Sequence, residues 1–295
     1  MKSRNWVFFL TMSAFWGLNW SITKLGLSFV SPATFVLTRF VFFSLAFFPV
    51  LLFLRRKIPR DRGTLAKIFV LCIVNVSQII TTNVALTEQS SGTGAVLNYT
   101  QPLFVFCLAI FFLNEGITPA KTIGVTIGFG GVFVFFSRSV SSVIFVSALV
   151  MVISAFLWAV TIVFYKKYLS HVDAFVASYF QYSLGALPLG FLVLVSNTFT
   201  FPSDPTYLWI LIYESIAVSA VGSTVWLYLT KKEGATVVAG SSLIVPVLAL
   251  FFGSVIMKEK VYSESIFGAA LILAGVFLVN IQQKRRTRAI DSDGS

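Results

Sequence analysis

Amide, hydroxyl and indole side chains lie inside long apolar segments of this sequence. Their types and spacing suit them to forming a binding site. Polar groups are costly in an apolar medium, so they tend to face the interior of a helix bundle or a water-filled cavity. Most of them are spaced three, four or seven residues apart, which places them on one helical face. The pattern predicts a binding site made of Trp16, Asn19, Trp20, Gln78, Thr82, Asn98, Tyr99, Trp158 and Tyr182.

These residues also have structural interpretations. Gln78 and Asn98 are equally suited to line a cavity or to make hydrogen bonds between helices, because their amides are costly to leave unpaired. Trp16 and Trp158 lie well inside their segments, whereas tryptophans of an interfacial belt lie near segment ends. A cavity lined by tryptophan would offer stacking faces to aromatic or cationic solutes.

Charged residues inside apolar segments need a separate account. Glu214 lies about eight residues, or ~12 Å, into its segment. An ionised carboxylate there costs roughly 2.5–3.5 kcal/mol or more. Glu214 is therefore a candidate for proton coupling, with pairing or water access as alternatives. Lys24 and Arg39 are placed near the outer ends of their segments at the level of Glu88. This predicts a structural cluster there or, alternatively, an electrostatic filter or anion contact on the outer path. Arg39 is thus a second candidate for coupling or gating.

Two prolines and two turn glutamates complete the candidates. Pro102 and Pro246 each remove one helix hydrogen bond near the middle of a segment, which would serve as a gating hinge or as a packing kink. Glu115 and Glu259 lie in turns about four residues before the next helix. There they are expected to cap that helix or to hold a lysine.

Sequence motifs for other chemistry are missing. The chain has no HExxH motif and no GxxxxGK[ST] loop, and its one histidine, His171, falls in a turn. Cys72 and Cys107 both lie in apolar runs and are expected to be small core residues. We therefore expect no catalytic residues, no metal and no cofactor, and we do not expect an enzyme.

The elements that position these residues are membrane helices arranged in a repeat. The chain is 57% hydrophobic and 11% charged, against about 25% charged in soluble domains. Residues 95, 102, 115, 124 and 131–133 return with the same identity at an offset of 144. The predicted fold is an all-α membrane protein with ten transmembrane helices in two five-helix repeats. The helices are expected at about 6–26, 33–54, 65–86, 91–112, 119–137, 143–165, 173–196, 206–230, 237–257 and 263–282.

Positive charges predict the orientation. Of the 22 Lys and Arg residues, Lys24 and Arg39 lie inside segments and Arg138, Lys258 and Lys260 fall on the outer side, so the rest lie on the side of the N-terminus. This bias places both termini in the cytoplasm and explains the net charge of +11 without nucleic acid. Because each half has five spans, the second half is inverted relative to the first. The predicted units are residues 1–138 and 139–283, followed by a basic cytoplasmic tail at 284–295.

The chain resembles the ten-helix EamA-type branch of the drug/metabolite transporter superfamily along almost its whole length. The order and spacing of several short motifs carry the resemblance, including Trp16-Gly17-Leu18-Asn19, Leu113-Asn114-Glu115 and Met257-Lys258-Glu259-Lys260. The aromatic amino acid exporters of this branch have a similar layout. Gln181 departs from the pattern, because the first half has Arg39 at the related position, at an offset of 142.

The resemblance implies export or exchange of a small organic solute such as an amino acid or a drug. Together with the tryptophan- and amide-rich face, it predicts a secondary transporter working by alternating access in the cell membrane. Its solute would be an amino acid with an aromatic or apolar side chain, in a monomer or homodimer surrounded by lipid. Alternatives are a sugar-phosphate or nucleotide-sugar exchanger, a multidrug exporter or, less favoured, a membrane scaffold.

Overall fold

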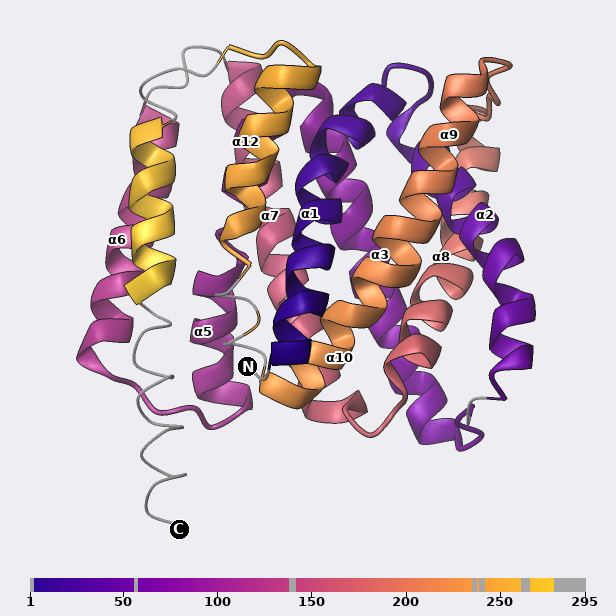
Figure 1. Cartoon of the computed structure of the whole chain (residues 1–295), viewed down its shortest axis with the longest axis horizontal. Helices are drawn as coiled ribbons and strands as arrows, with labels where there is room; N and C mark the ends of the chain where they lie inside the picture. Colours follow the sequence, from indigo (N-terminus) through magenta and orange to yellow (C-terminus); the bar gives the residue numbers. More distant parts are fainter. Residues whose placement is uncertain are drawn as a thin grey trace.

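The computed structural model describes residues 3–55, 58–137, 142–234, 238, 242–260 and 266–278. Within these ranges the chain is all helical, without a strand. Figure 1 shows the helices side by side and roughly parallel to one direction. The first half contains α1 (Ser3–Gly26), α2 (Pro32–Phe53), α3 (Arg62–Glu88), α4 (Ser91–Asn98), α5 (Gln101–Phe112) and α6 (Pro119–Ser137).

The second half repeats this series. It contains α7 (Ser142–Phe164), a π-helical stretch (Tyr165–Leu169), α8 (Ala174–Ser196), α9 (Pro205–Tyr213), a second π-helical stretch (Glu214–Gly222), α10 (Ser223–Glu233), α12 (Ile244–Ile256) and the helix Ile266–Leu278. Six helical stretches are long and apolar enough to cross a membrane, and shorter apolar helices accompany them in the described residues. Each of the predicted apolar segments contains helical residues, but segment 91–112 is divided between α4 and α5, and parts of 237–257 and 263–282 lie outside the described residues. The predicted boundary at 138/139 and the tail at 284–295 lie outside the described residues.

Polar residues before the helices explain where several of them begin. Ser31, Asp61, Ser90 and Asp204 each accept a hydrogen bond from a backbone N–H two or three residues ahead, in the first turn of the following helix. The backbone hydrogen bond from Thr64 lowers the pKa of the Asp61 carboxyl below its usual value. These caps fix the ends of the helices outside their apolar parts.

The sequence repeat is also a repeat of backbone structure. Asn114 and Lys258, which are 144 residues apart, both adopt left-handed backbone angles, with φ of 55° and 53°. The next residue in each turn, Glu115 or Glu259, donates its N–H to the carbonyl six residues earlier, at 3.1 and 3.2 Å. The same helix-ending turn, with a left-handed residue followed by a hydrogen bond to the carbonyl six residues earlier, therefore forms twice at related positions.

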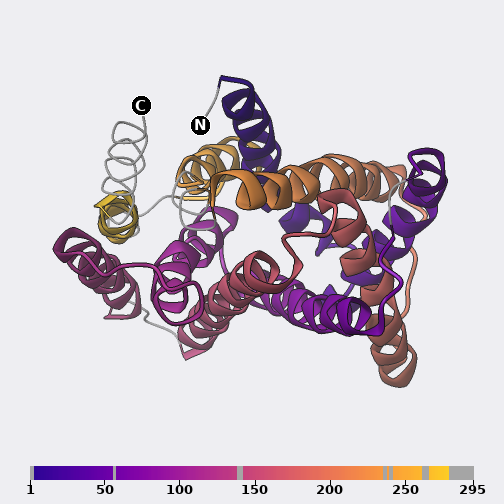
Figure 2. The same cartoon turned by 90° about the horizontal axis from the view of Figure 1, so that it is seen from below.

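Close contacts between glycines join the two halves. A Cβ atom added at Gly131 of α6 would lie 2.8 Å from both the Gly268 oxygen and the Ile272 nitrogen. A Cβ atom at Gly275 would lie even closer to the Gly124 oxygen and the Gly128 nitrogen. Each of these two contacts is the repeat-related equivalent of the other. Together they bring α6 and the helix Ile266–Leu278 (yellow) side by side at one side of the molecule (Figures 1 and 2).

Related helices run in opposite directions. In Figure 1, α1 runs upward and α7 runs downward, and the same holds for α3 and the α9–α10 pair. Equivalent helices also make equivalent contacts. The contact of α3 with α7 corresponds to the contact of α1 with the π-helical stretch 214–222. The contact of α5 with α7 corresponds to the contact of α12 with α1. α2 packs on α8, its own counterpart.

The two prolines lie at helix starts, which differs from the predicted hinge within a continuous helix. α4 ends at Asn98, and α5 begins at Gln101 after a turn at Tyr99 and Thr100. Pro102 lies in the first turn of α5, and Pro246 is the third residue of α12. The missing N–H of a proline is of no consequence in a first turn, because no helical partner is available there. The predicted loss of a mid-helix hydrogen bond is therefore wrong for Pro102.

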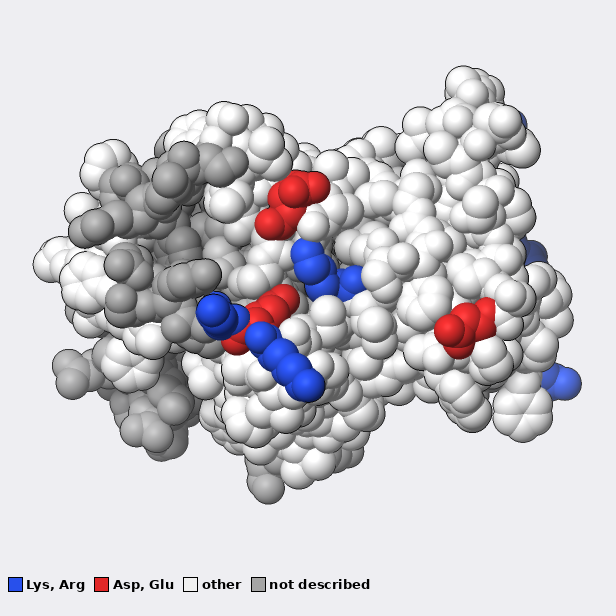
Figure 3. Space-filling view, turned by 90° about the horizontal axis from the view of Figure 1, so that it is seen from above, with Lys and Arg blue, Asp and Glu red and all other residues white. Residues whose placement is uncertain are grey.

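Charged residues differ between the two ends of the molecule. We call the end with turns 27–31, 89–90, 197–204 and 257–260 the upper end and the other the lower end, as in Figure 1. Among described residues, the lower end has Arg55, Arg60, Arg62, Lys67, Lys121, Lys166, Lys167, Lys231 and Lys232. The upper end has Lys24, Lys258 and Lys260, and Figure 3 shows its few charged side chains mainly around the middle of a largely uncharged face.

The upper charges bind helix ends. The Lys24 ammonium donates to the carbonyl oxygens of Leu86, Thr87 and Gln89 at 2.8–2.9 Å, where α3 ends. The Glu259 carboxylate accepts hydrogen bonds from the Ser91 N–H and hydroxyl, both at 2.7 Å, at the start of α4. Glu259 thus caps a helix of the other half. It was predicted to cap the helix that follows it, and the residues just before Ile266 lie outside the described part of the chain.

The lower turn glutamate holds a lysine, as predicted. Glu115 pairs with Lys121 at 3.4 Å.

Candidate solute-binding cavity

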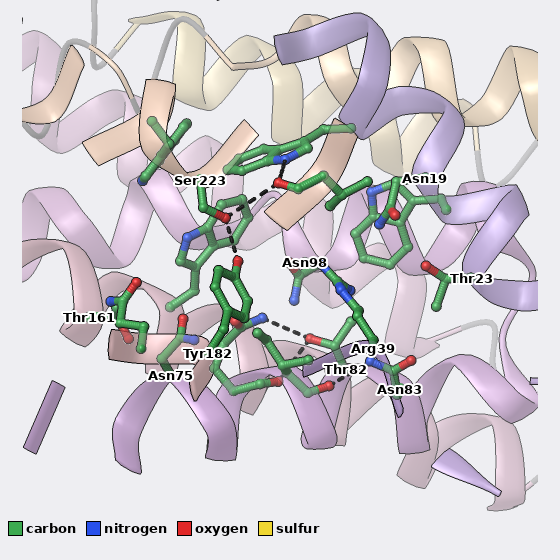
Figure 4. Close-up of a pocket in the computed structure, with 18 of the residues that line it drawn as sticks. Asn19, Thr23, Arg39, Asn75, Thr82, Asn83, Asn98, Thr161, Tyr182 and Ser223 are labelled. Carbon is green, nitrogen blue, oxygen red and sulfur yellow. Dashed lines mark hydrogen bonds between the residues drawn. The ribbon is translucent and has the colours of Figure 1, made fainter. Parts of the chain in front are cut away.

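A cavity of about 130 Å³ lies between helices of both halves. At roughly 10–15 Å³ for one water-sized particle, it has room for on the order of ten non-hydrogen atoms. Every residue predicted for the binding site lies in its wall: Trp16, Asn19, Trp20, Gln78, Thr82, Asn98, Tyr99, Trp158 and Tyr182. The structure thus brings together residues that are up to 166 positions apart in the sequence (16 to 182). Figure 4 shows Asn19, Thr23 and Arg39 on one side of the pocket and Asn75 and Thr161 on the other.

Three tryptophans form one aromatic cluster in the wall. The ring centroids of Trp16 and Trp158 are 5.7 Å apart, and Trp226 lies 5.1 and 5.4 Å from them. Tyr99 stands edge-on to Trp158 at 5.3 Å. These separations are typical of favourable aromatic contacts. Trp16 and Trp158 occupy related positions on α1 and α7, so the repeat supplies both halves of the cluster.

Amide and hydroxyl groups form a second wall. The Gln78 amide nitrogen donates to the Thr82 hydroxyl at 2.9 Å and approaches the Ser154 hydroxyl at 3.4 Å. The Asn98 amide nitrogen donates to the same Ser154 hydroxyl at 3.1 Å. The sequence left two roles open for Gln78 and Asn98, cavity lining and hydrogen bonding between helices. Both residues have both roles: they line the cavity, and their hydrogen bonds join α3, α4 and α7. Ser154 itself does not line the cavity.

Several polar atoms of the wall have hydrogen-bonding capacity left. The side-chain nitrogens of Asn75, Gln181 and Trp226 and the side-chain oxygen of Asn83 are buried and have no partner among the described residues. Buried polar groups are normally hydrogen-bonded to protein or to water. Because these atoms all belong to cavity-lining residues, a solute or water in the cavity can supply the partners.

Arg39 and Glu214 form an ion pair beside the cavity. One terminal guanidinium nitrogen, Nη1, lies 2.8 Å from the Glu214 carboxylate, and Nε donates to the Ser219 hydroxyl at 2.9 Å. Thr23 donates to Glu214 at 2.6 Å, and the Asn19 amide, oriented with its nitrogen toward the carboxylate, donates at 2.8 and 2.9 Å. Glu214 is 0% exposed and lies behind the wall, whereas Arg39 is part of it.

This ion pair corrects one prediction and bears on another. Arg39 does not join Lys24 and Glu88 in a cluster at the end of the molecule, because it turns inward to Glu214. For Glu214, pairing is the alternative that the structure contains. Glu214 begins the π-helical stretch 214–222, and the Ser219 hydroxyl donates to its backbone oxygen at 2.9 Å. Local π-helical segments within α-helices are frequent at functional sites.

Pro102 and Pro246 are not part of the cavity wall. The wall also includes residues that the predicted site left out. Trp226 is the largest of them, and the related Gln181 and Arg39 both contribute. The remaining members are Thr23, Asn75, Ile79, Asn83, Leu86, Thr161, Ile162, Val218, Ser223 and Leu227. Helical spacing was the available signal for Asn75, Thr161 and Trp226, since each lies three or four residues from another polar or small residue of its helix.

Two helical repeats around a polar, aromatic cavity define a multi-pass membrane protein of the solute-transport class. The sequence matches the EamA-like transporter family twice, over residues 5–137 and 145–281. The chain therefore belongs to this family, and its setting is a membrane and its partner a small-molecule solute.

Relatives and a solved structure agree with this assignment. The chain is 26% identical over 290 residues to "Uncharacterized transporter YoaV" of Bacillus subtilis, covering 94% of this chain and 97% of that one. It is 28% identical over 277 residues to an "Uncharacterized transporter" of Archaeoglobus fulgidus, covering 94% and 98%. A "Probable amino-acid metabolite efflux pump" of Escherichia coli is 24% identical over 312 residues, covering 98% and 99%. A solved crystal structure has the same fold, with a TM-score of 0.72 at 17% identity, covering 97% of this chain and 99% of that one.

Proposed function

We propose that this protein is a secondary active transporter that exports or exchanges a small amino acid metabolite with an aromatic or apolar side chain. The observation that carries the proposal is the cavity wall, in which a tryptophan cluster adjoins a row of amides and hydroxyls. Aromatic faces suit the apolar body of such a solute, and the amides suit its polar end. The name of the Escherichia coli relative is in keeping with this solute class.

We further propose the orientation and mechanism. The chain would span the cell membrane ten times as two inverted units, residues 1–138 and 139–283, with both termini and the basic tail at 284–295 in the cytoplasm. The lower end, rich in Lys and Arg, would be the cytoplasmic side. Opposed repeats around a central cavity suit alternating access. The protein would work without a cofactor, nucleic acid or enzymatic step, as a monomer or homodimer in lipid.

The proposed binding residues predict a loss of transport. Trp158→Ala and Gln78→Ala should each reduce uptake of labelled phenylalanine into proteoliposomes about tenfold or more, because each removes part of the wall that holds the solute. Flux should be measured alongside the amount of folded, reconstituted protein. Trp209→Ala is the matched control, since Trp209 is 70% exposed on the outer face of α9. Unchanged flux in both cavity variants would contradict the proposed site.

The choice of solute has its own test. Counterflow that accepts sugar phosphates and no amino acid would replace the proposal with the sugar-phosphate exchanger. Flux of many unrelated cations would favour the multidrug exporter.

A role of Glu214 in proton coupling requires that Glu214→Gln remove the dependence of flux on a pH gradient. Hinge roles of Pro102 and Pro246 require that Pro→Ala variants change turnover and leave binding intact.

The proposed orientation predicts opposite labelling of two turns. Ile117 and Lys260 are exposed residues beside the related glutamates 115 and 259. With Cys72 and Cys107 replaced, a membrane-impermeant thiol reagent applied to intact cells should label Lys260→Cys and spare Ile117→Cys until the cells are permeabilised. Labelling of both from the same side would refute the inverted arrangement.

A further inference from the structure

We infer that Arg39 is the anion anchor of the cavity and binds the carboxylate of a monoanionic or zwitterionic solute. The inference deepens the proposed function, on which it rests, by naming the group that a solute must carry. It follows from the charge of the cavity wall, from the way Arg39 is held, and from the difference between the two halves at this position.

The cavity wall has one charge among the described residues. Arg39 lines the cavity, while its partner Glu214 is completely buried behind it. The positive end of the ion pair therefore faces the cavity and the negative end faces away. A carboxylate entering the cavity meets a guanidinium, for which planar, paired hydrogen bonds are the preferred geometry. A phosphate dianion would require a second cation, and no other described residue of the wall supplies one.

The guanidinium is held in place before any solute arrives. Ser219 accepts from Nε and Glu214 binds Nη1, while Thr23 and Asn19 donate to the Glu214 carboxylate. Arg39 is still part of the cavity wall, so the guanidinium donors that these contacts do not use are available to the solute. A fixed side chain loses little conformational freedom on binding, which favours affinity.

The two halves differ in the residue at this position, so the two sides of the cavity are chemically different. Gln181 of α8 corresponds to Arg39 of α2 at an offset of 142, the same offset that relates Trp158 to Trp16, and both Gln181 and Arg39 line the cavity. One half therefore offers a charged donor and the other an uncharged amide. The tryptophan cluster provides the apolar remainder of the wall. Together these features fit a solute with one carboxylate and an aromatic or branched apolar body.

The experiment compares matched pairs of probes on the purified full-length protein. The pairs are L-phenylalanine with L-phenylalaninamide and 3-phenylpropionate with 3-phenylpropanol, and glycerol 3-phosphate represents phosphate. Binding is measured by titration calorimetry. Within each pair we expect the carboxylate to bind about tenfold or more tightly, as a charged hydrogen bond would provide. In the neutral variant Arg39→Gln/Glu214→Gln the difference should disappear, because both charges are removed together.

Two further variants separate anchoring from general structural damage. Arg39→Lys keeps the ion pair but loses the planar donor array, so carboxylate affinity should fall about tenfold while the thermal stability stays near that of the wild type. Ser219→Ala should weaken carboxylate binding several-fold. Its matched control is Ser215→Ala, four residues earlier, where the hydroxyl approaches the Arg39 backbone oxygen at 3.3 Å and does not bind the guanidinium.

The outcomes distinguish the anchor from the proposed function. Preference for 3-phenylpropionate over 3-phenylpropanol without any binding of phenylalanine supports the anchor and contradicts the amino acid proposal. Equal binding within both pairs, preference for glycerol 3-phosphate, or binding of none of the probes overturns the anchor. A carboxylate preference that survives in the neutral double variant overturns it as well.

Discussion

Replacing Arg39 with methionine should lower the free energy of unfolding by about 3–5 kcal/mol, the usual result of removing one partner of a buried ion pair. The reason is the Glu214 carboxylate, which is 0% exposed and would lose the cation 2.8 Å away. The hydrogen bonds from Thr23 and Asn19 would remain, but they do not neutralise the charge. Unfolding can be measured in detergent by heating and by denaturant, at neutral pH.

The double variant Arg39→Met/Glu214→Gln provides the control for this prediction. Glutamine keeps an oxygen that can accept from Thr23 and Asn19, and neither residue is then charged. We expect the double variant to be more stable than Arg39→Met alone, so that the effects of the single changes do not add. Additive losses would show that the two side chains do not stabilise each other in the folded protein.

A second large effect is expected at the glycine contact between α6 and the helix Ile266–Leu278. Gly131→Val and Gly275→Val should each destabilise the protein by about 3 kcal/mol or more, because an overpacked side chain must push the helices apart. At Gly131 even the first added carbon would lie 2.8 Å from backbone atoms of the opposite helix. Backbone cannot move aside as a flexible side chain can. Thermal unfolding of the purified variants measures the loss.

Gly130 gives a matched control for this contact. It precedes Gly131 on α6, and a Cβ atom added there would meet nothing within 4 Å. Gly130→Val should therefore change stability by no more than the small difference in helix propensity. If Gly130→Val and Gly131→Val lose the same stability, the close approach of the two helices is not what stabilises this side of the molecule.

Much of the arrangement was predictable because the information is local or periodic. The offset of 144 predicted the repeat, and the Asn114 and Lys258 turns form the same structure at that offset. Helical spacing predicted that Gln78 and Thr82 share a face, and the cost of burying an amide predicted that this face is internal. Trp16 and Trp158 were predicted to line a cavity because both lie well inside their segments.

The rest depends on packing between distant segments, which spacing along one helix does not encode. Arg39 and Glu214 are 175 positions apart, and their pairing follows from the packing of α2 on the π-helical stretch 214–222. The run 91–112 was expected to be one helix with a kink at Pro102, and its sequence did not indicate that one helix ends at Asn98 and another begins at Gln101. Nor could the turn at Glu259 be assigned to the start of α4, because its partner belongs to the other half.

The hydrogen bonds of Glu259 have a mechanical consequence for the cavity. They fasten the turn after α12 to Ser91 and Gly92, the first residues of α4. α4 is a short helix of 8 residues, and its last residue, Asn98, belongs to the cavity wall. A displacement of that turn therefore carries Asn98 with it while the Glu259 bonds hold. Movement of the turn after α12 and the position of Asn98 in the cavity wall are in this way mechanically coupled.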